Sequence, residues 1–134
     1  MYFDITRKVI GAAMQVHRTL GPGFPERIYQ RALAIELTIS DLIFEREKEI
    51  ETWYRDQRIG TRRADFFVEN CIIVEIKALS QLENGHLAQA MNYLEISRMK
   101  IGLLINFGAK SLEYKRVHNN LLIKKEGDLN ESLF

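Results

Sequence analysis

Hydrophobic positions recur at helical spacing in the first third of the chain. Apolar residues close to one stripe predict a helix over residues 5–20, and the glycine-rich segment 21–23 ends it. A second helix is predicted from Pro25 to about Ser40, because proline is tolerated in a first turn and Glu26 suits the positive helix end. Its expected apolar face consists of Ile28, Ala32, Ile35 and Leu37.

Beyond the second helix the pattern predicts strands, with one helix among them. Residues 43–54 alternate imperfectly, but their aromatic and β-branched side chains favour a strand, and 55–60 read as a turn. Helical spacing returns only over 83–98. The remaining strands are expected at 61–69, 71–78, 101–107 and 112–118. This order predicts an α+β fold, with helices packed against a mixed sheet.

The size and composition of the chain agree with one globular domain. Its 134 residues suffice for a single core, and 46% hydrophobic with 28% charged residues is ordinary for such a domain. We expect the domain to span residues 1–123, and the polar segment 124–134 to form a flexible tail. The net charge of +1 gives no overall basic footprint for nucleic acid.

Cysteine content and hydropathy indicate the compartment. The single cysteine, Cys71, excludes an internal disulfide framework and cannot form a zinc site alone. No basic-then-apolar signal segment opens the chain, and no apolar run approaches membrane-spanning length. We therefore expect a cytoplasmic protein without a membrane partner.

Two charges interrupt an otherwise apolar predicted strand. In "CIIVEIKALSQ" (residues 71–81), Glu75 and Lys77 lie two positions apart and therefore on one face. Burying such charges without partners is costly. In the preceding strand, alternation is expected to place Ala64 and Phe66 on the apolar face, with Asp65 opposite.

Matching the apolar faces of these two strands sets their register. The faces coincide only if Phe66 lies opposite Val74, which places Asp65 directly opposite Glu75. This register is centred on Asn70, so the connection must contain three residues, or a bulge, with Asn70 suited to a positive φ. A two-residue turn would mix the faces.

Directly opposed carboxylates suggest a cation between them. Their Cβ atoms would be about 4.5–5.5 Å apart, where two negative charges repel unless a proton or cation intervenes. An all-oxygen site suits Mg²⁺ or Mn²⁺, and Lys77 could stabilise developing charge or orient a water. Spacing alone leaves open an alternative, in which these residues form a surface Asp–Lys or Glu–Lys pair on an exposed sheet face.

The context of these residues resembles a known superfamily. Asp65, followed after a hairpin by Glu75-x-Lys77 in an apolar strand, resembles the signature of the PD-(D/E)XK nuclease superfamily. The element order resembles its restriction-endonuclease-like α-β-β-β-α-β core with an additional N-terminal helix. Gln89-x₃-Tyr93 is similar to the QxxxY motif of RecB-type nucleases.

The N-terminal third carries a more specific resemblance. "VHRTLGPGFPERIY" resembles the hallmark of the GxxExxY proteins, a small family within that superfamily, with Gly23, Glu26 and Tyr29 at the three named positions. "IGLLINFG" (101–108) resembles the late strand of this family. The resemblance covers roughly residues 5–118. One departure is Ala64, which stands where many members have a proline before the acid.

The resemblance implies a role for each matched residue. Asp65 and Glu75 would bind the metal, with the Ile76 carbonyl as a further ligand, and Lys77 would be the catalytic lysine. Glu26 would supply a third acid near the metal. The residues implied to position substrate or water are Gln89 and Tyr93. One alternative is that Glu26 is only a favourable first-turn charge. Another is that Gln89 and Tyr93 serve packing and solvation of their helix.

Together these features predict a Mg²⁺- or Mn²⁺-dependent nuclease that hydrolyses DNA or RNA with a metal-activated water. Within a basic cluster, Arg58, Arg62 and Arg63 are expected phosphate contacts, although charges on a solvated hairpin edge explain them equally well. One alternative is an inactive module that retains the fold and binds nucleic acid or protein. A homodimer is a further expectation that the sequence leaves open.

Overall fold

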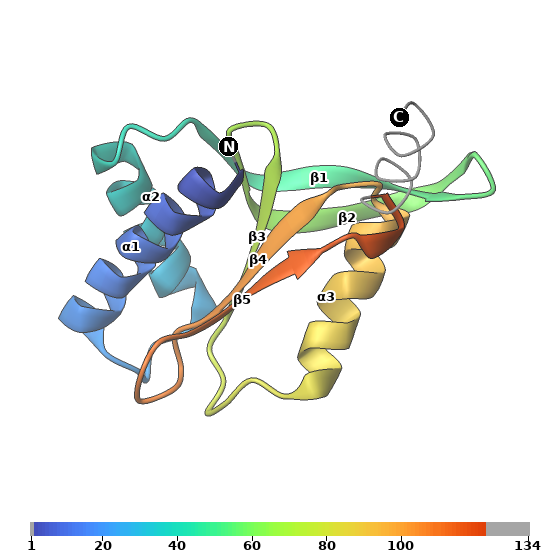
Figure 1. The fold of residues 1–134 in the computed structure, drawn as a ribbon. Helices are drawn as coiled ribbons and strands as arrows, with labels where there is room; N and C mark the ends of the chain where they lie inside the picture. Colours follow the sequence, from blue (N-terminus) through green and yellow to red (C-terminus); the bar gives the residue numbers. More distant parts are fainter. Residues whose placement is uncertain (1, 123–134) are drawn as a thin grey trace, which may run out of the picture.

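A five-stranded mixed sheet in the order β1-β2-β3-β4-β5 forms the centre of the molecule (Figure 1). The computed structural model describes residues 2–122, so the predicted tail lies outside the described residues. The helices are α1 (Tyr2–Leu20), α2 (Glu26–Ile39) and α3 (Asn84–Ile96). The strands are β1 (Phe44–Tyr54), β2 (Gln57–Val68), β3 (Ile72–Lys77), β4 (Ile101–Asn106) and β5 (Glu113–His118).

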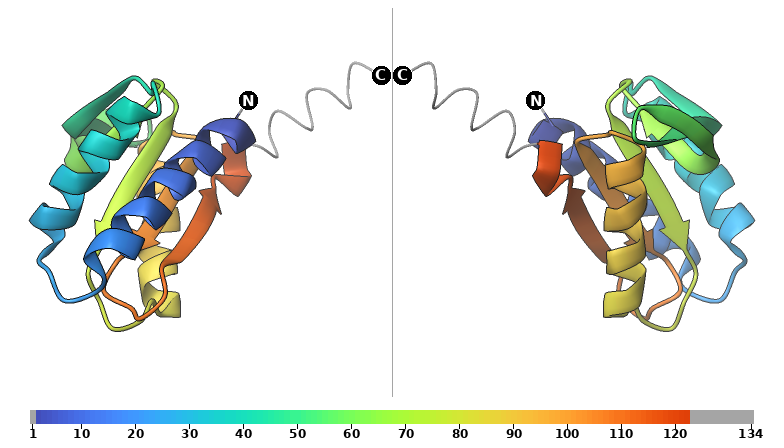
Figure 2. Two further views of the ribbon diagram at one scale, coloured as in Figure 1. Left: turned by 90° about the vertical axis from the view of Figure 1, so that its left-hand side faces the viewer. Right: turned by 90° about the vertical axis from the view of Figure 1, so that its right-hand side faces the viewer.

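The predicted order of elements is confirmed, including the last strand. Strands β1, β2 and β3 pair antiparallel, β3 and β4 pair parallel, and β4 and β5 pair antiparallel. Helix α3 is the crossover between the two parallel strands, as parallel pairing requires. Helices α1 and α2 cover one face of the sheet and α3 covers the other (Figure 2).

Each face of the sheet carries its own apolar core. The larger core lies beneath α1 and α2 and includes Tyr29, Phe66, Val74 and Phe107, all fully buried. The smaller core lies beneath α3. It consists of Ile50, Ala64, Ile73, Leu94, Leu104 and Val117. None of the helices within residues 2–122 is long and apolar enough to cross a membrane.

The β2–β3 hairpin has the predicted register over its three paired positions, but these end at Phe66 and do not include the predicted pair of Asp65 and Glu75. Phe66 pairs with Val74, and the turn is a three-residue connection between the paired Val68 and Ile72. Asn70 has the expected positive φ of 54°, and Glu69 before it has a φ of 52°. The Cys71 N–H closes the turn by donating to the Val68 carbonyl at 3.1 Å.

Asn70 offers a direct test of this turn. The Asn70→Ala variant is expected to lose about 1 kcal/mol of stability, because alanine tolerates the left-handed region less well than asparagine. The Asn70→Gly variant is expected to be at least as stable as wild type. Urea denaturation of the three proteins measures both effects. Equal stabilities for the alanine and glycine variants would argue against a left-handed residue here.

The β1–β2 ribbon changes face between two of its paired positions. Phe66 belongs to the core beneath α1 and α2, whereas Ala64 belongs to the core beneath α3. The prediction that these two residues share a face was therefore wrong. On β1 the same step contains Glu47, whose φ of 50° interrupts regular strand geometry. We call this step, formed by Glu47 and Asp65, the face switch.

The predicted apolar face of α2 was wrong in part, because only Leu37 of its members is fully buried. The residues it buries are Tyr29, Gln30, Leu33 and Leu37, while Ile35 is 63% exposed. Both stripes have helical spacing, so periodicity alone could not separate them. The Tyr29 ring stacks on Phe107 with 4.7 Å between ring centroids, and burial of this large pair orients the helix.

The segment 55–60, predicted as a turn, is mostly strand. Only Arg55 and Asp56 form the turn, with φ values of 48° and 65°, and β2 begins at Gln57. Pairing of Tyr54 with Gln57 shows a two-residue loop. Two residues with positive φ match the right-handed twist of the flanking strands, so the ribbon extends further than its polar sequence suggested.

Candidate active site

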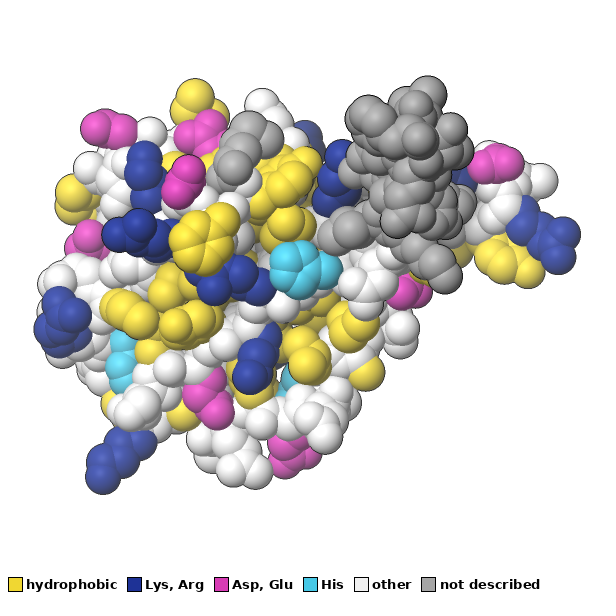
Figure 3. All heavy atoms as spheres, in the orientation of Figure 1, with side chains coloured by type: hydrophobic (Ala, Val, Ile, Leu, Met, Phe, Trp, Pro, Cys, Tyr) yellow, Lys and Arg dark blue, Asp and Glu magenta, His cyan; other side chains and the backbone are white. Residues whose placement is uncertain are grey.

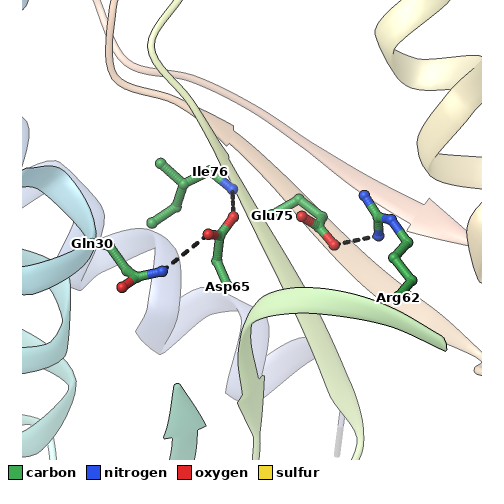
Figure 4. Close-up of polar contacts among 5 residues, drawn as sticks. All are labelled: Gln30, Arg62, Asp65, Glu75 and Ile76. Carbon is green, nitrogen blue, oxygen red and sulfur yellow. Dashed lines mark hydrogen bonds and ion pairs between the residues drawn. The ribbon is translucent and has the colours of Figure 1, made fainter. Parts of the chain in front are cut away.

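The Asp65 side chain lies at the face switch and is held by two neighbouring elements. Its Oδ2 atom accepts a hydrogen bond from the Ile76 backbone N–H of β3 at 2.7 Å. Its Oδ1 atom accepts one from Gln30 Nε2 of α2 at 3.0 Å (Figure 4). These bonds fix the orientation of the carboxylate and leave lone pairs on both oxygens for a further ligand.

Gln30 is a site residue that the sequence interpretation missed. It is 7% exposed, and its Oε1 atom accepts a hydrogen bond from Arg46 Nη2 at 3.1 Å. Because a guanidinium can only donate, this bond directs the amide nitrogen of Gln30 toward Asp65. A signal was present, since Gln30 lies one helical turn after Glu26 and directly follows the buried Tyr29.

Glu75 extends from β3 toward α3 and is largely shielded from water. Its side chain is 13% exposed and forms an ion pair with the Arg62 guanidinium of β2. Burial raises the pKa of Glu75 to about 7; the Arg62 charge opposes this shift and the Asp65 charge adds to it. The two predicted metal ligands are therefore close enough to interact electrostatically, as their neighbouring positions in Figure 4 also show.

Lys77 ends β3 two residues beyond Glu75 and is half-buried. Its positive charge lowers the pKa of Glu75, although less than burial raises it. Lys77 and Asp65 thus both act on the charge of Glu75, in opposite directions.

Residues of the late strand fix the chain just beyond Lys77. The Asn106 Oδ1 atom accepts a hydrogen bond from Leu79 N–H at 2.8 Å, and its Nδ2 atom donates to the Leu79 carbonyl at 2.9 Å. A Cβ at Gly108 would lie 2.4 Å from backbone atoms of Ala78 and Leu79, so only glycine fits there. These contacts explain the "INFG" sequence and define where β3 ends.

Tyr29 holds the loop that leads into α2. Its hydroxyl donates to the Gly21 carbonyl at 2.6 Å and accepts from the Phe24 N–H at 3.2 Å. Gly23, between them, has a φ of 110° that favours glycine. Glu26 follows in the first turn of α2, where it is exposed and has no hydrogen bond to Asp65 or Glu75.

The remaining predicted residues divide into two groups. Tyr93 reaches the site indirectly, because the Arg62 guanidinium lies 4.0 Å from the centroid of its ring. Gln89 is exposed one turn earlier on α3. Arg58 and Arg63 lie on the exposed part of the ribbon. Each pairs there with an acid of β1, Glu51 and Glu49 respectively.

The donor set of the site fits a hard divalent cation. Among residues 2–122 no three His, Cys, Asp or Glu side chains lie together as a metal cluster, and Glu26 does not join the other two acids. Structural zinc would need such a cluster. Mg²⁺ needs only one or two carboxylates, because it retains several waters and takes oxygens from its substrate. Asp65 and Glu75 supply two carboxylates of that kind on neighbouring strands, with Asp65 bonded to α2 and Glu75 paired with Arg62.

Comparison with known proteins identifies the superfamily of the chain. A solved structure described as "Crystal structure of SSO0001" is similar in fold, with a TM-score of 0.53 and 18% sequence identity. The similarity covers 76% of this chain and 55% of that chain, so this protein spans about half its length. No curated protein matches the sequence. The family model of the PD-(D/E)XK nuclease superfamily matches residues 3–117. With its restriction-endonuclease-like mixed sheet, the chain belongs to the PD-(D/E)XK nuclease superfamily.

Proposed function

We propose that this protein is a nuclease that hydrolyses phosphodiester bonds of DNA or RNA and depends on Mg²⁺ or Mn²⁺. The observation that carries the proposal is the position of Asp65 beside Glu75 on neighbouring strands (Figure 4), with Lys77 two residues further along β3. Membership of a nuclease superfamily supports it. Within that superfamily we propose that the chain belongs to the GxxExxY family, because the Tyr29 hydroxyl bonds to Gly21 and Phe24 on either side of Gly23, the first residue of the motif.

The chain's own residues have distinct roles in this reaction. Asp65 and Glu75 would hold the cation, which when bound polarises the phosphate and activates water. Lys77 stabilises the negative charge that develops on the phosphate oxygens. Gln30 keeps the Asp65 carboxylate in one orientation. The carboxylate therefore loses little conformational freedom when a cation binds to it.

Exposed polar residues around these acids are proposed substrate contacts. Gln89 is exposed on α3 and would contact the substrate, whereas Glu26, an exposed acid of α2, would act only through a bound cation, because its carboxylate repels phosphate. Arg58 and Arg63 would contact phosphates after leaving their exposed glutamate partners, a small cost for surface ion pairs. Figure 3 shows basic and acidic side chains interspersed over the face it presents. With a net charge of +1, this distribution favours recognition of a few phosphates over a long tract.

Metal removal gives the test of this function. We expect wild-type protein to cleave at least one of four labelled substrates, namely single- and double-stranded DNA and RNA, when Mg²⁺ or Mn²⁺ is present. Cleavage should stop in EDTA and return when the cation is restored, because EDTA removes the group that polarises the phosphate and activates water. Absence of cleavage with both cations, or cleavage that persists in EDTA, would contradict the proposal.

An inactive binding module is the second candidate function. The observation that favours it is the ion pair between Glu75 and Arg62, which neutralises one of the two acids without a metal. Calorimetric titration with Mn²⁺ separates the candidates, because an inactive module should show no binding that depends on Asp65. Solution mass measured on the same sample tests for a homodimer.

A further inference from the structure

The Arg62 guanidinium has two partners, and both belong to the proposed active site. It forms an ion pair with the Glu75 carboxylate, and it lies 4.0 Å from the centroid of the Tyr93 ring. The side chains of Arg62 and Glu75 are 23% and 13% exposed, so solvent and salt screen this pair only weakly. The arginine therefore supplies the positive charge that Glu75 would otherwise take from a divalent cation.

Arg62 and a divalent cation compete for the same carboxylate. Direct coordination draws on the Glu75 carboxylate, whose Oε1 atom the guanidinium now contacts, and two positive charges at one carboxylate repel each other in a poorly solvated site. Whatever removes Arg62 from Glu75 must therefore strengthen cation binding. By thermodynamic reciprocity, the cation must also make Arg62 more available to another anion.

The geometry around Tyr93 suggests which anion that is. The aromatic ring contacts the face of the guanidinium, whereas anions bind to its edge, where the N–H groups lie. Arg62 could thus exchange one anion for another while it stays stacked on Tyr93. A phosphate suits this edge as well as a carboxylate does, because both accept two parallel N–H hydrogen bonds.

We propose that Arg62 is shared between Glu75 in the free protein and a substrate phosphate in the complex. Binding of the phosphate then releases Glu75 for Mg²⁺ or Mn²⁺, so that nucleic acid and cation bind cooperatively. Tyr93 is a positioning residue that holds the guanidinium between its two anions. This inference rests on the proposed function, because it requires Glu75 to be a metal ligand.

Mn²⁺ affinity in the absence of nucleic acid tests the first half of the inference. Arg62→Met is expected to bind Mn²⁺ about tenfold more tightly than wild type, within the usual range of coupling between two sites. Tyr93→Phe keeps the ring and should match wild type, whereas Tyr93→Leu should bind Mn²⁺ more tightly without any change of charge. Arg98→Met is the matched control, because Arg98 also pairs with an acid, Asp56, and lies over an aromatic ring elsewhere.

Nuclease-resistant strands test the second half of the inference, which is that nucleic acid and cation bind cooperatively. A phosphorothioate DNA strand and a 2′-O-methyl RNA strand are added separately before the Mn²⁺ titration, followed by calorimetry. At least one strand should tighten Mn²⁺ binding by wild type about tenfold and leave the Arg62→Met variant unchanged. Wild-type affinity that neither strand alters would overturn the shared role of Arg62.

The outcomes also separate this inference from the proposed function. If neither wild type nor Arg62→Met binds Mn²⁺, the proposed metal-dependent function fails, and the inference fails with it. If both bind Mn²⁺ with equal affinity, the function stands and competition by Arg62 is excluded. A Tyr93→Leu variant that matches wild type would exclude the positioning role of the ring.

Discussion

The Lys77→Met variant is expected to cleave nucleic acid about a thousandfold more slowly than wild type while it binds Mn²⁺ with similar affinity. Removal of one group that stabilises transition-state charge typically costs a factor of about 10²–10³ in rate. Lys77 is half-buried at the end of β3, and methionine retains most of the volume of its aliphatic part. Single-turnover cleavage and Mn²⁺ calorimetry measure the two effects separately.

Two further variants define what the Lys77 result means. Asp65→Asn should lose both cleavage and Mn²⁺ binding, because asparagine lacks the charge of a metal ligand. Lys8→Met changes an exposed lysine on α1 and should leave both unchanged. A Lys77→Met variant that also loses Mn²⁺ binding would show that the lysine acts on the site's structure, and full activity in that variant would remove its catalytic role.

The sequence predicted the β2–β3 hairpin well, because a single alternation fixes its register. Once the apolar faces are matched, Phe66 has only one partner, Val74, and the connection must have an odd number of residues. Burial of Ile72 and Val74 on one side of β3 enforces that choice in the structure. Local pattern and long-range packing therefore gave the same answer here.

The orientation of the two acids was not predictable from alternation. At the face switch, Ala64 and Phe66 point to opposite cores, so the period of two fails at Asp65 itself. Asp65 consequently bonds to α2 through Gln30, while Glu75 points toward α3 and meets Arg62. The position of Gln30 on α2 carried a signal, but neither contact could be paired from sequence, because each joins residues brought together only by tertiary packing.

The assignment of polar residues on α2 illustrates the same limit. Glu26, an acid in a first turn, was predicted as a site residue, whereas Gln30, one turn later, was not predicted at all. Packing of Tyr29 against Phe107 rotates the helix so that Gln30 faces the sheet and Glu26 remains exposed. The rotation depends on which of two helical stripes buries more apolar area, and that comparison needs the sheet as a partner.

The Glu75→Gln variant is expected to be more stable than wild type at high pH in the absence of metal, by about 3 kcal/mol above pH 8. Burial raises the pKa of Glu75 from 4.5 to about 7 in the folded protein. Below pH 4.5 the carboxyl is protonated in both folded and unfolded chains, so the two proteins should have similar stability. As pH rises, the unfolded chain releases its proton first. The free energy of unfolding of wild type therefore falls by about 1.4 kcal/mol for each pH unit between the two pKa values.

Glutamine resembles the protonated acid and cannot titrate, so the stability difference should grow between pH 4.5 and 7 and then remain constant. Urea denaturation in EDTA at pH 4.5, 6 and 8.5 measures it, with Glu45→Gln at an exposed position of β1 as the control for the acid-to-amide change itself. Parallel pH dependence of wild type and Glu75→Gln would contradict a buried, destabilising carboxylate. The predicted gain would mean that the fold retains Glu75 at a cost in stability, as expected of a residue kept for binding a cation.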